Sequence, residues 1–273
     1  MLYSKKQKEK IFKDINENGY AYLKNVYTNK QLNKVKSSLL SMLNYINPEK
    51  KGKSLQEKYY QIKKMSPILK GHFYELCKNE LEILKLVNDE KIVDLVKGFF
   101  KTDVIFSGQP GMLVYDDEND RCLVPHQETH QFAKDFLFVW SPLYDAKGDQ
   151  GGLLIYEKSH KHGYYKHHTN NQLGSTNVND DALKKFKPKK LEVKAGDALL
   201  IHSALIHGSV ETKKKYFSRF IIIDRLCPLK KLPYLEKENV PKKIPYFGHG
   251  EGGDTVDYNT KNIYLNDSNN RKN

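Results

Sequence analysis

The sequence predicts a mainly β fold with flanking helices, in which the strands form a double-stranded β-helix (jelly roll). Two observations carry this prediction. From about residue 103 the chain consists of short β-type runs separated by Gly, Pro and Asp/Asn turns. Before that point, apolar residues recur at helical spacing. We expect one domain over 1–273, with a helical N-terminal part (1–102), a jelly-roll core (103–227) and a wrapping C-terminal tail (228–273).

The N-terminal part begins with a charged, amphipathic stretch at 5–17, and "GYAYLKNV" (19–26) then alternates like a short strand. Thr28 is a suitable N-cap for a helix over about 29–45. Near 78–100, apolar residues at near-helical spacing predict a second helical stretch whose apolar face belongs to the core.

Six β-type runs follow: "DVIFSG", "GMLVYDD", "FLFVWSPLYD", "GGLLIYEKS", "KLEVKAGDALLIH" and "RFIIIDRL". Short strands without intervening helices favour a sandwich or jelly roll. After about residue 228 the chain is rich in Pro, Lys and Gly and loses its periodicity, as expected of a tail.

Composition excludes several classes of protein. The net charge is +13, but the lysines are scattered, which indicates a solvated surface and no nucleic-acid partner. No apolar run is long enough for a membrane span, and the N-terminus lacks the apolar segment of a signal peptide, so we expect a cytoplasmic protein. Three widely spaced cysteines, Cys77, Cys122 and Cys227, favour reduced thiols.

The stretch "PHQETHQF" (125–132) places His126, Glu128 and His130 at alternate positions. On a strand these side chains share one face, so they would point together into a barrel, where imidazole and carboxylate begin a metal site. The alternative is a set of ordinary rim residues satisfied by hydrogen bonds. A helical zinc-protease motif is excluded, because Gln127 stands where that motif needs Glu.

A second histidine strand strengthens the metal hypothesis. His207 lies 81 residues after His126, past four predicted strands, so a jelly roll can return it to the first pair. Two His and one carboxylate with open coordination positions form the facial triad of non-heme Fe(II) oxygenases. Ser209 follows closely, and Arg219 begins the next predicted strand, where a buried guanidinium would pair with a carboxylate. The distal end of 2-oxoglutarate is such a carboxylate.

At these residues the sequence resembles the phytanoyl-CoA dioxygenase (PhyH) family of Fe(II)/2-oxoglutarate oxygenases, whose relatives include ectoine hydroxylases. Three stretches carry the resemblance: "NGYAYLKNVYTNKQL", "FVWSPLYDAKGDQGGLLIYEKSHKHG" and "AGDALLIHSALIHGS". It implies that His126, Glu128 and His207 bind Fe(II), that Ser209 and Arg219 hold the distal carboxylate of 2-oxoglutarate, and that dioxygen is the second co-substrate.

The resemblance extends to further positions. Gln109 matches a pocket position that faces co-substrate or substrate, and Trp140 falls on a strand close to the site. His130 is a candidate substrate contact, with a satisfied rim histidine as the alternative. Arg225 is an alternative partner for the carboxylate, but it lies six residues beyond Arg219 and is therefore expected at the far end of the strand.

The family usually has Asp where this chain has Glu128, and the spacing from His207 to Arg219 is about one residue longer than usual. The implied reaction is hydroxylation of an unactivated C–H bond, with release of succinate and CO₂. Relatives that halogenate leave the carboxylate position empty, so Glu128 favours hydroxylation over halogenation. Desaturation, cyclisation and epimerisation stay open.

Two rivals remain at this level. A cupin-like isomerase or sugar-binding protein would use the same jelly roll and a metal without 2-oxoglutarate, and a basic adaptor would bind a polyanion in a salt-dependent way. The basic balance favours an anionic small-molecule substrate. Its identity and the oligomeric state are not encoded in any motif of the chain.

Overall fold

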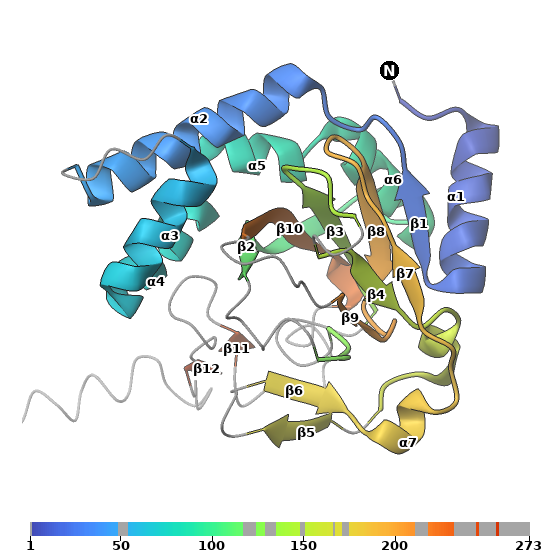
Figure 1. The fold of residues 1–273 in the computed structure, drawn as a ribbon. Coiled ribbons are helices and arrows are strands. Elements are labelled where there is room, and N and C mark those ends of the chain that lie inside the picture. Colours follow the sequence, from blue (N-terminus) through green and yellow to red (C-terminus); the bar gives the residue numbers. More distant parts are fainter. Residues whose placement is uncertain are drawn as a thin grey trace, which may run out of the picture.

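A computed structural model describes most of the chain (Figure 1). The described residues are 2–48, 54–116, 124–128, 135–147, 151–165, 167–170, 175–210, 218–231, 244–245 and 255–256.

Helices dominate the N-terminal part and strands follow them, in the predicted order. The helices are α1 (Lys5–Asn18), α2 (Asn29–Ile46), α3 (Leu55–Met65), α4 (Pro67–Lys78), α5 (Leu81–Val87), α6 (Glu90–Phe100) and α7 (Asp180–Leu183), with short 3₁₀ turns η2 (Ser159–His162) and η3 (Leu229–Lys231). The strands are β1 (Tyr20–Leu23), β2 (Ile105–Asp116), β3 (Leu137–Pro142), β4 (Leu153–Ile155), β5 (His167–Asn170), β6 (Ser175–Val178), β7 (Lys189–Leu191), β8 (Ala198–His202), β9 (His207–Ser209), β10 (Ser218–Pro228), β11 (Ile244–Pro245) and β12 (Thr255–Val256).

The strands form two principal antiparallel sheets, as the jelly-roll prediction requires. The larger sheet has the order β1-β8-β3-β10-β2, and the smaller one has the order β7-β4-β9. Strands next to each other in a sheet come from distant parts of the sequence, so the fold depends on long-range pairing. Two further strand pairs, β5-β6 and β11-β12, lie outside these sheets.

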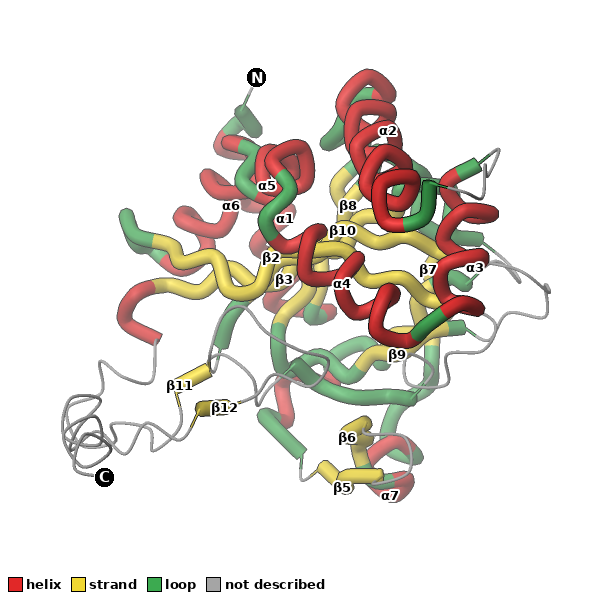
Figure 2. Tube along the Cα trace, turned by 90° about the vertical axis from the view of Figure 1, so that its left-hand side faces the viewer, coloured by secondary structure: helices red, strands yellow, loops and turns green. Residues whose placement is uncertain are grey.

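Strand β10 shows how the larger sheet separates two cores. Phe220 and Ile222 face the helices and pack with their apolar residues, whereas Ile221 packs with Phe138 and Trp140 between the two sheets. Alternate residues of a strand point to opposite faces, so one strand serves both cores. The predicted mixture of a helical layer and a β core is confirmed, with helices α2 to α6 gathered on one face of the larger sheet (Figure 2).

The helix boundaries follow local capping signals. Thr28 caps α2 as predicted: its hydroxyl accepts a hydrogen bond from the Gln31 amide, and the Gln31 side chain accepts one from the Thr28 amide. Ser54 and Glu57 form the same capping box at α3. Pro67 at the start of α4 suits the first turn of a helix, where its missing amide hydrogen costs nothing.

Two expectations need correction. The single helical stretch near 78–100 is divided into α5 and α6, because the Asp89 side chain caps a new helix by accepting a hydrogen bond from the Lys91 amide. The runs "DVIFSG" and "GMLVYDD" belong to one strand, β2, which pairs with β10 along its length apart from an irregularity between Ile223 and Arg225. The predicted wrapping of the tail falls almost entirely outside the described residues.

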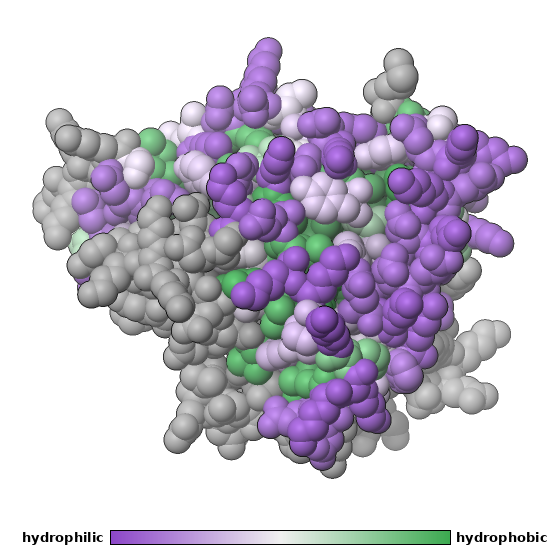
Figure 3. Space-filling model, turned by 45° about the vertical axis from the view of Figure 1, so that its right-hand side comes forward, coloured by the Kyte–Doolittle hydropathy of each residue, from purple (hydrophilic) through white to green (hydrophobic). Residues whose placement is uncertain are grey.

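None of the helices within the described ranges combines the length and the apolar character needed to cross a lipid bilayer. On the face drawn in Figure 3, hydrophilic side chains are spread over the described surface, with small apolar areas between them. This distribution agrees with the interpretation of the scattered lysines as solvated surface charge.

The turn before β8 requires glycine at position 196, and this requirement can be tested by mutation. Gly196 has φ +92°, and a Cβ atom there would lie 2.8 Å from the Tyr27 carbonyl oxygen, so Gly196→Ala should lower the free energy of unfolding by about 1–3 kcal/mol. Gly71→Ala is the matched control, because Gly71 lies within α4 with open space around it, and it should stabilise by about 0.5–1 kcal/mol. Urea denaturation measures both, and equal effects of the two variants would contradict the role of the turn.

Candidate metal centre and the adjoining carboxylate pocket

The segment 124–128 is held between two parts of the jelly roll. The His126 amide donates to the His207 carbonyl oxygen at 2.8 Å, and the His207 amide donates back to His126 at 3.0 Å. The Glu128 amide donates to the Ser203 carbonyl oxygen at 3.0 Å, and the Pro125 carbonyl oxygen accepts from Val178. The segment is therefore positioned by backbone bonds to β9, to the turn after β8 and to β6.

Gln127 points away from its two neighbours and anchors the segment from the other side. Its amide nitrogen donates to the carbonyl oxygens of Gly163, at 2.9 Å, and Ala204, at 2.6 Å, and its oxygen accepts from the Tyr165 amide at 2.9 Å. Gln127 is 3% exposed. Sequence reasoning used Gln127 only to exclude a helical zinc motif and missed this anchoring role.

The structure brings His126, Glu128 and His207 together. One ligand atom from each lies within 4.8 Å of the others. Glu128 Oε1 is 3.5 Å from His126 Nε2 and 3.8 Å from His207 Nε2. His207 and Glu128 are largely buried, and His126 is partly exposed. The predicted association of the two histidine segments is thus present in the fold.

The donor set suits a metal ion. His126 Nδ1 lies 2.8 Å from the Val124 carbonyl oxygen, and His207 Nδ1 lies 3.0 Å from that of Leu205. A carbonyl oxygen only accepts, so each Nδ1 carries the hydrogen. In the neutral form of either ring, the lone pair is therefore on Nε2. Both Nε2 atoms face the Glu128 carboxylate. Two imidazole nitrogens and one carboxylate oxygen are the ligands of a 2-His-1-carboxylate iron site.

Burial and charge set the protonation states of this cluster. Burial, aided by His126, lowers the pKa of His207 to about 3. Burial also acts to lower the pKa of His126, but the hydrogen bond and charge of Glu128 outweigh it and raise that pKa. Burial would raise the pKa of Glu128, yet Arg225 and His126 hold it well below its usual range. At neutral pH the site therefore offers an ionised carboxylate and a neutral His207.

A second cluster lies beside the first. Arg219 is 3% exposed and donates to the Ser209 hydroxyl at 2.9 Å and to the Gly152 carbonyl oxygen at 3.1 Å. Ser209 follows His207 by two residues on β9, so their side chains share a face about 7 Å apart. A guanidinium is a strong hydrogen-bond donor to carboxylates, so this cluster is a candidate binding place for one.

Trp140 lies against Arg219. The Arg219 guanidinium carbon lies 5.3 Å from the centre of the Trp140 ring, which fits a cation–π contact, and Trp140 is itself buried. Gln109 lies on β2, but the position of its side chain is outside what the structure describes, and His130 is outside the described residues altogether. Their predicted contacts stay predictions.

Arg225 makes a contact that sequence reasoning did not foresee. It lies six residues beyond Arg219 on β10, as predicted, and there its side chain contacts Glu128. The alternation of β10 provided a signal, because residues 219 and 225 are separated by an even number of positions and share a face.

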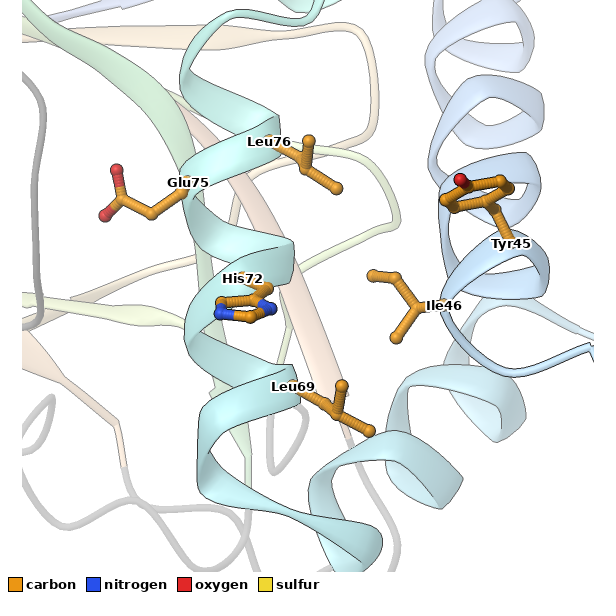
Figure 4. Close-up of a pocket in the computed structure, with 6 residues that line it drawn as sticks. All are labelled: Tyr45, Ile46, Leu69, His72, Glu75 and Leu76. Atoms are coloured by element: carbon orange, nitrogen blue, oxygen red, sulfur yellow. The ribbon is translucent and has the colours of Figure 1, made fainter.

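A separate groove of about 440 Å³ lies in the helical layer between α2 and α4 (Figure 4). Ile46, Leu69 and Leu76 point into the space between the two helices, whereas Glu75 points away from it. The groove contains none of the three metal-ligand candidates.

Comparisons with known proteins give one family match and several similar folds. The sequence profile of "Phytanoyl-CoA dioxygenase (PhyH)" matches residues 15–216. No curated protein sequence matches the chain. Among solved structures, the epimerase SnoN in complex with Fe3+, alpha ketoglutarate and nogalamycin RO aligns with a TM-score of 0.60 at 12% identity, covering 92% of this chain and 98% of SnoN.

Two other solved structures show the same fold. The non-heme monooxygenase ThoJ aligns with a TM-score of 0.59 at 14% identity, covering 95% of this chain and 94% of its own. The non-heme alpha ketoglutarate dependent carbocyclase SnoK from nogalamycin biosynthesis aligns with a TM-score of 0.56 at 15% identity, covering 83% and 84%. At these identities the similarity establishes the jelly-roll fold, as the sequence predicted.

The anchoring by Gln127 can be tested separately from the ligands. Gln127→Ala should lower the free energy of unfolding by about 2 kcal/mol, because the buried carbonyl group of Ala204 and the less buried backbone groups of Gly163 and Tyr165 lose their partner. Gln7→Ala, at the exposed cap of α1, is a control expected to cost under about 1 kcal/mol. Denaturant titration would refute the anchoring role if the two losses were equal.

Proposed function

Since this chain belongs to the phytanoyl-CoA dioxygenase family, we propose that it is an Fe(II)- and 2-oxoglutarate-dependent oxygenase that hydroxylates an unactivated C–H bond of a small molecule. The observation that carries the proposal is the presence of His126, Glu128 and His207 on one face, next to a buried arginine. Neither cluster alone would identify the reaction class. Together they provide ligands for iron and a cation for the 2-oxo acid.

His126, Glu128 and His207 would hold the iron. When bound there, Fe(II) supplies the activation of dioxygen, coupled to the decarboxylation of 2-oxoglutarate to succinate and CO₂. Three protein ligands would leave three of the six positions of an octahedral ion for co-substrates. The backbone bonds between residues 126 and 207 keep the two imidazoles in place before any ligand arrives.

Arg219 and Ser209 would bind the distal carboxylate of 2-oxoglutarate. The guanidinium is held by the Gly152 carbonyl oxygen and lies against Trp140, so it is oriented in advance. Its burial lowers the local dielectric constant, which strengthens an ion pair with a carboxylate. Gln109 is proposed to face the same pocket from β2.

Several observations bear on the reaction type. The similar structures are described as an epimerase, a monooxygenase and a carbocyclase, so the fold serves more than one outcome. We favour hydroxylation over halogenation, because Glu128 occupies the position that a halide ligand would need.

The charge and the cysteines bear on the substrate and on the cellular location. The net charge of +13 favours an anionic substrate, which His130 is proposed to contact. The two described cysteines are free thiols, as expected in the cytoplasm.

The main rival is a cupin-type metal protein that acts as an isomerase or binds sugars without 2-oxoglutarate. Such a protein needs the metal ligands but has no use for a buried arginine beside them. The Arg219–Ser209 pair therefore supports the oxygenase. A nucleic-acid adaptor is less well supported still, because it has no use for the three metal-ligand candidates or for the buried Arg219.

Anaerobic titration of the protein with Fe(II) and 2-oxoglutarate tests the proposal directly. We expect the weak visible charge-transfer band of the chelate, and Arg219→Lys should raise the half-saturating concentration of 2-oxoglutarate by about tenfold, because lysine lacks the planar fork. An iron complex without any such band would favour the cupin-type rival. An unchanged half-saturating concentration would place the carboxylate partner elsewhere.

Succinate formation provides the second test. His207→Ala should abolish iron-dependent succinate formation, because one of three metal ligands is lost. His72→Ala is the matched control: His72 lies on α4 in the groove with α2, so activity should be retained. Mass-spectrometric detection of succinate at the parental rate in the His207 variant would disprove the assignment of the ligands.

A further inference from the structure

We infer that Arg225 is a positioning residue that holds Glu128 so that this glutamate offers only one oxygen atom to the metal. The inference rests on the proposed metal centre and goes beyond it, because it assigns the orientation of the carboxylate ligand to a specific partner. It also accounts for a glutamate where related proteins usually have aspartate.

Arg225 reaches the site from the larger sheet. It lies on β10, where its cross-strand neighbours are Gly108 of β2 and Phe138 of β3. Cross-strand neighbours share a face, and Gly108 has no side chain to occupy the space beside the guanidinium. The irregular pairing between Ile223 and Arg225 lies next to this position and changes the register of the strand there.

The contacts distinguish the two oxygen atoms of Glu128. Arg225 Nε donates to Oε2 at 2.8 Å, and a terminal guanidinium nitrogen lies 2.6 Å from the same oxygen. Oε1 instead faces His126 Nε2 at 3.5 Å and His207 Nε2 at 3.8 Å. Oε2 is therefore hydrogen-bonded to the arginine, and Oε1 is the atom available to a metal ion.

The length of the Glu128 side chain allows one carboxylate oxygen to bind Arg225 while the other faces the two histidines. Glu128 begins on a segment held against Ser203 and β9, whereas Arg225 approaches from β10. An aspartate at position 128 would withdraw the carboxylate by about 1.5 Å, the length of one C–C bond. The shorter carboxylate could keep the metal position or the arginine contact, but not both in the geometry present here.

The orientation has a consequence for coordination. A carboxylate that bound through both oxygens would occupy two of the six positions of an octahedral ion and leave two open. With Oε2 held by Arg225, the protein supplies three ligands and leaves three positions, which is the number that a bidentate 2-oxo acid and dioxygen need. Arg225 thus preserves the open side of the centre.

Anaerobic titration with Co(II), followed by its visible absorption, tests the inference without oxygenase turnover. Arg225→Met should weaken Co(II) binding by about tenfold to a hundredfold, the usual cost of losing a residue that orients a metal ligand. Arg225→Lys should recover part of the loss, because it restores one donor. Lys189→Met, which removes a surface ion pair with Glu157, is the control and should bind as the parent does.

A double-mutant cycle separates positioning from a general charge effect. Glu128→Asp should weaken Co(II) binding by about tenfold when Arg225 is present, and by less than about threefold in the Arg225→Met background, because no arginine contact then has to be spanned. Circular dichroism confirms that each variant is folded. An equal loss in both backgrounds, or unchanged or tighter binding by Arg225→Met, would overturn the inference and leave the proposed function intact. If the folded parent bound no Co(II), the metal centre itself would be wrong.

Discussion

The carboxylate and the two histidines meet only because segment 124–128 pairs with β9. Two reciprocal backbone hydrogen bonds between His126 and His207 determine the register of that pairing. Because side chains alternate along an extended chain, a shift of one residue would turn His126 and Glu128 away from His207. Gln127 disfavours such a shift, since its side chain would lose its hydrogen bonds to three backbone groups on the opposite side.

Strand β10 connects the stability of the fold to the chemistry of the site. On one face, Phe220 and Ile222 pack in the core beneath the helices, and on the other, Arg219 and Arg225 contact Ser209 and Glu128 respectively. The apolar face keeps the strand in place, so the two arginines are held in a fixed position beside Ser209 and Glu128. The two arginines thus lie on the strand that pairs with both β2 and β3 in the larger sheet.

Much of this arrangement follows from the sequence, because local patterns specify local structure. The alternation around His126 and the capping signal at Thr28 both predicted features that are present. Helices α3 and α4 lie in the part predicted to be helical but were not predicted individually, although the Ser54–Glu57 capping box and Pro67 mark where they begin. The Glu128–Arg225 contact could not be derived, because it joins segments 97 residues apart and depends on how the strands close into a barrel.

The distance in sequence between the metal-binding segments has a thermodynamic consequence. An ion bound to His126, Glu128 and His207 would close a loop of about 80 residues, as a cross-link does. It would lower the conformational entropy of any unfolded chain that kept the ion bound. An ion that binds only the closed form raises the population of that form in proportion to its free concentration. The free metal concentration would then affect the fraction of folded protein as well as the fraction of loaded sites.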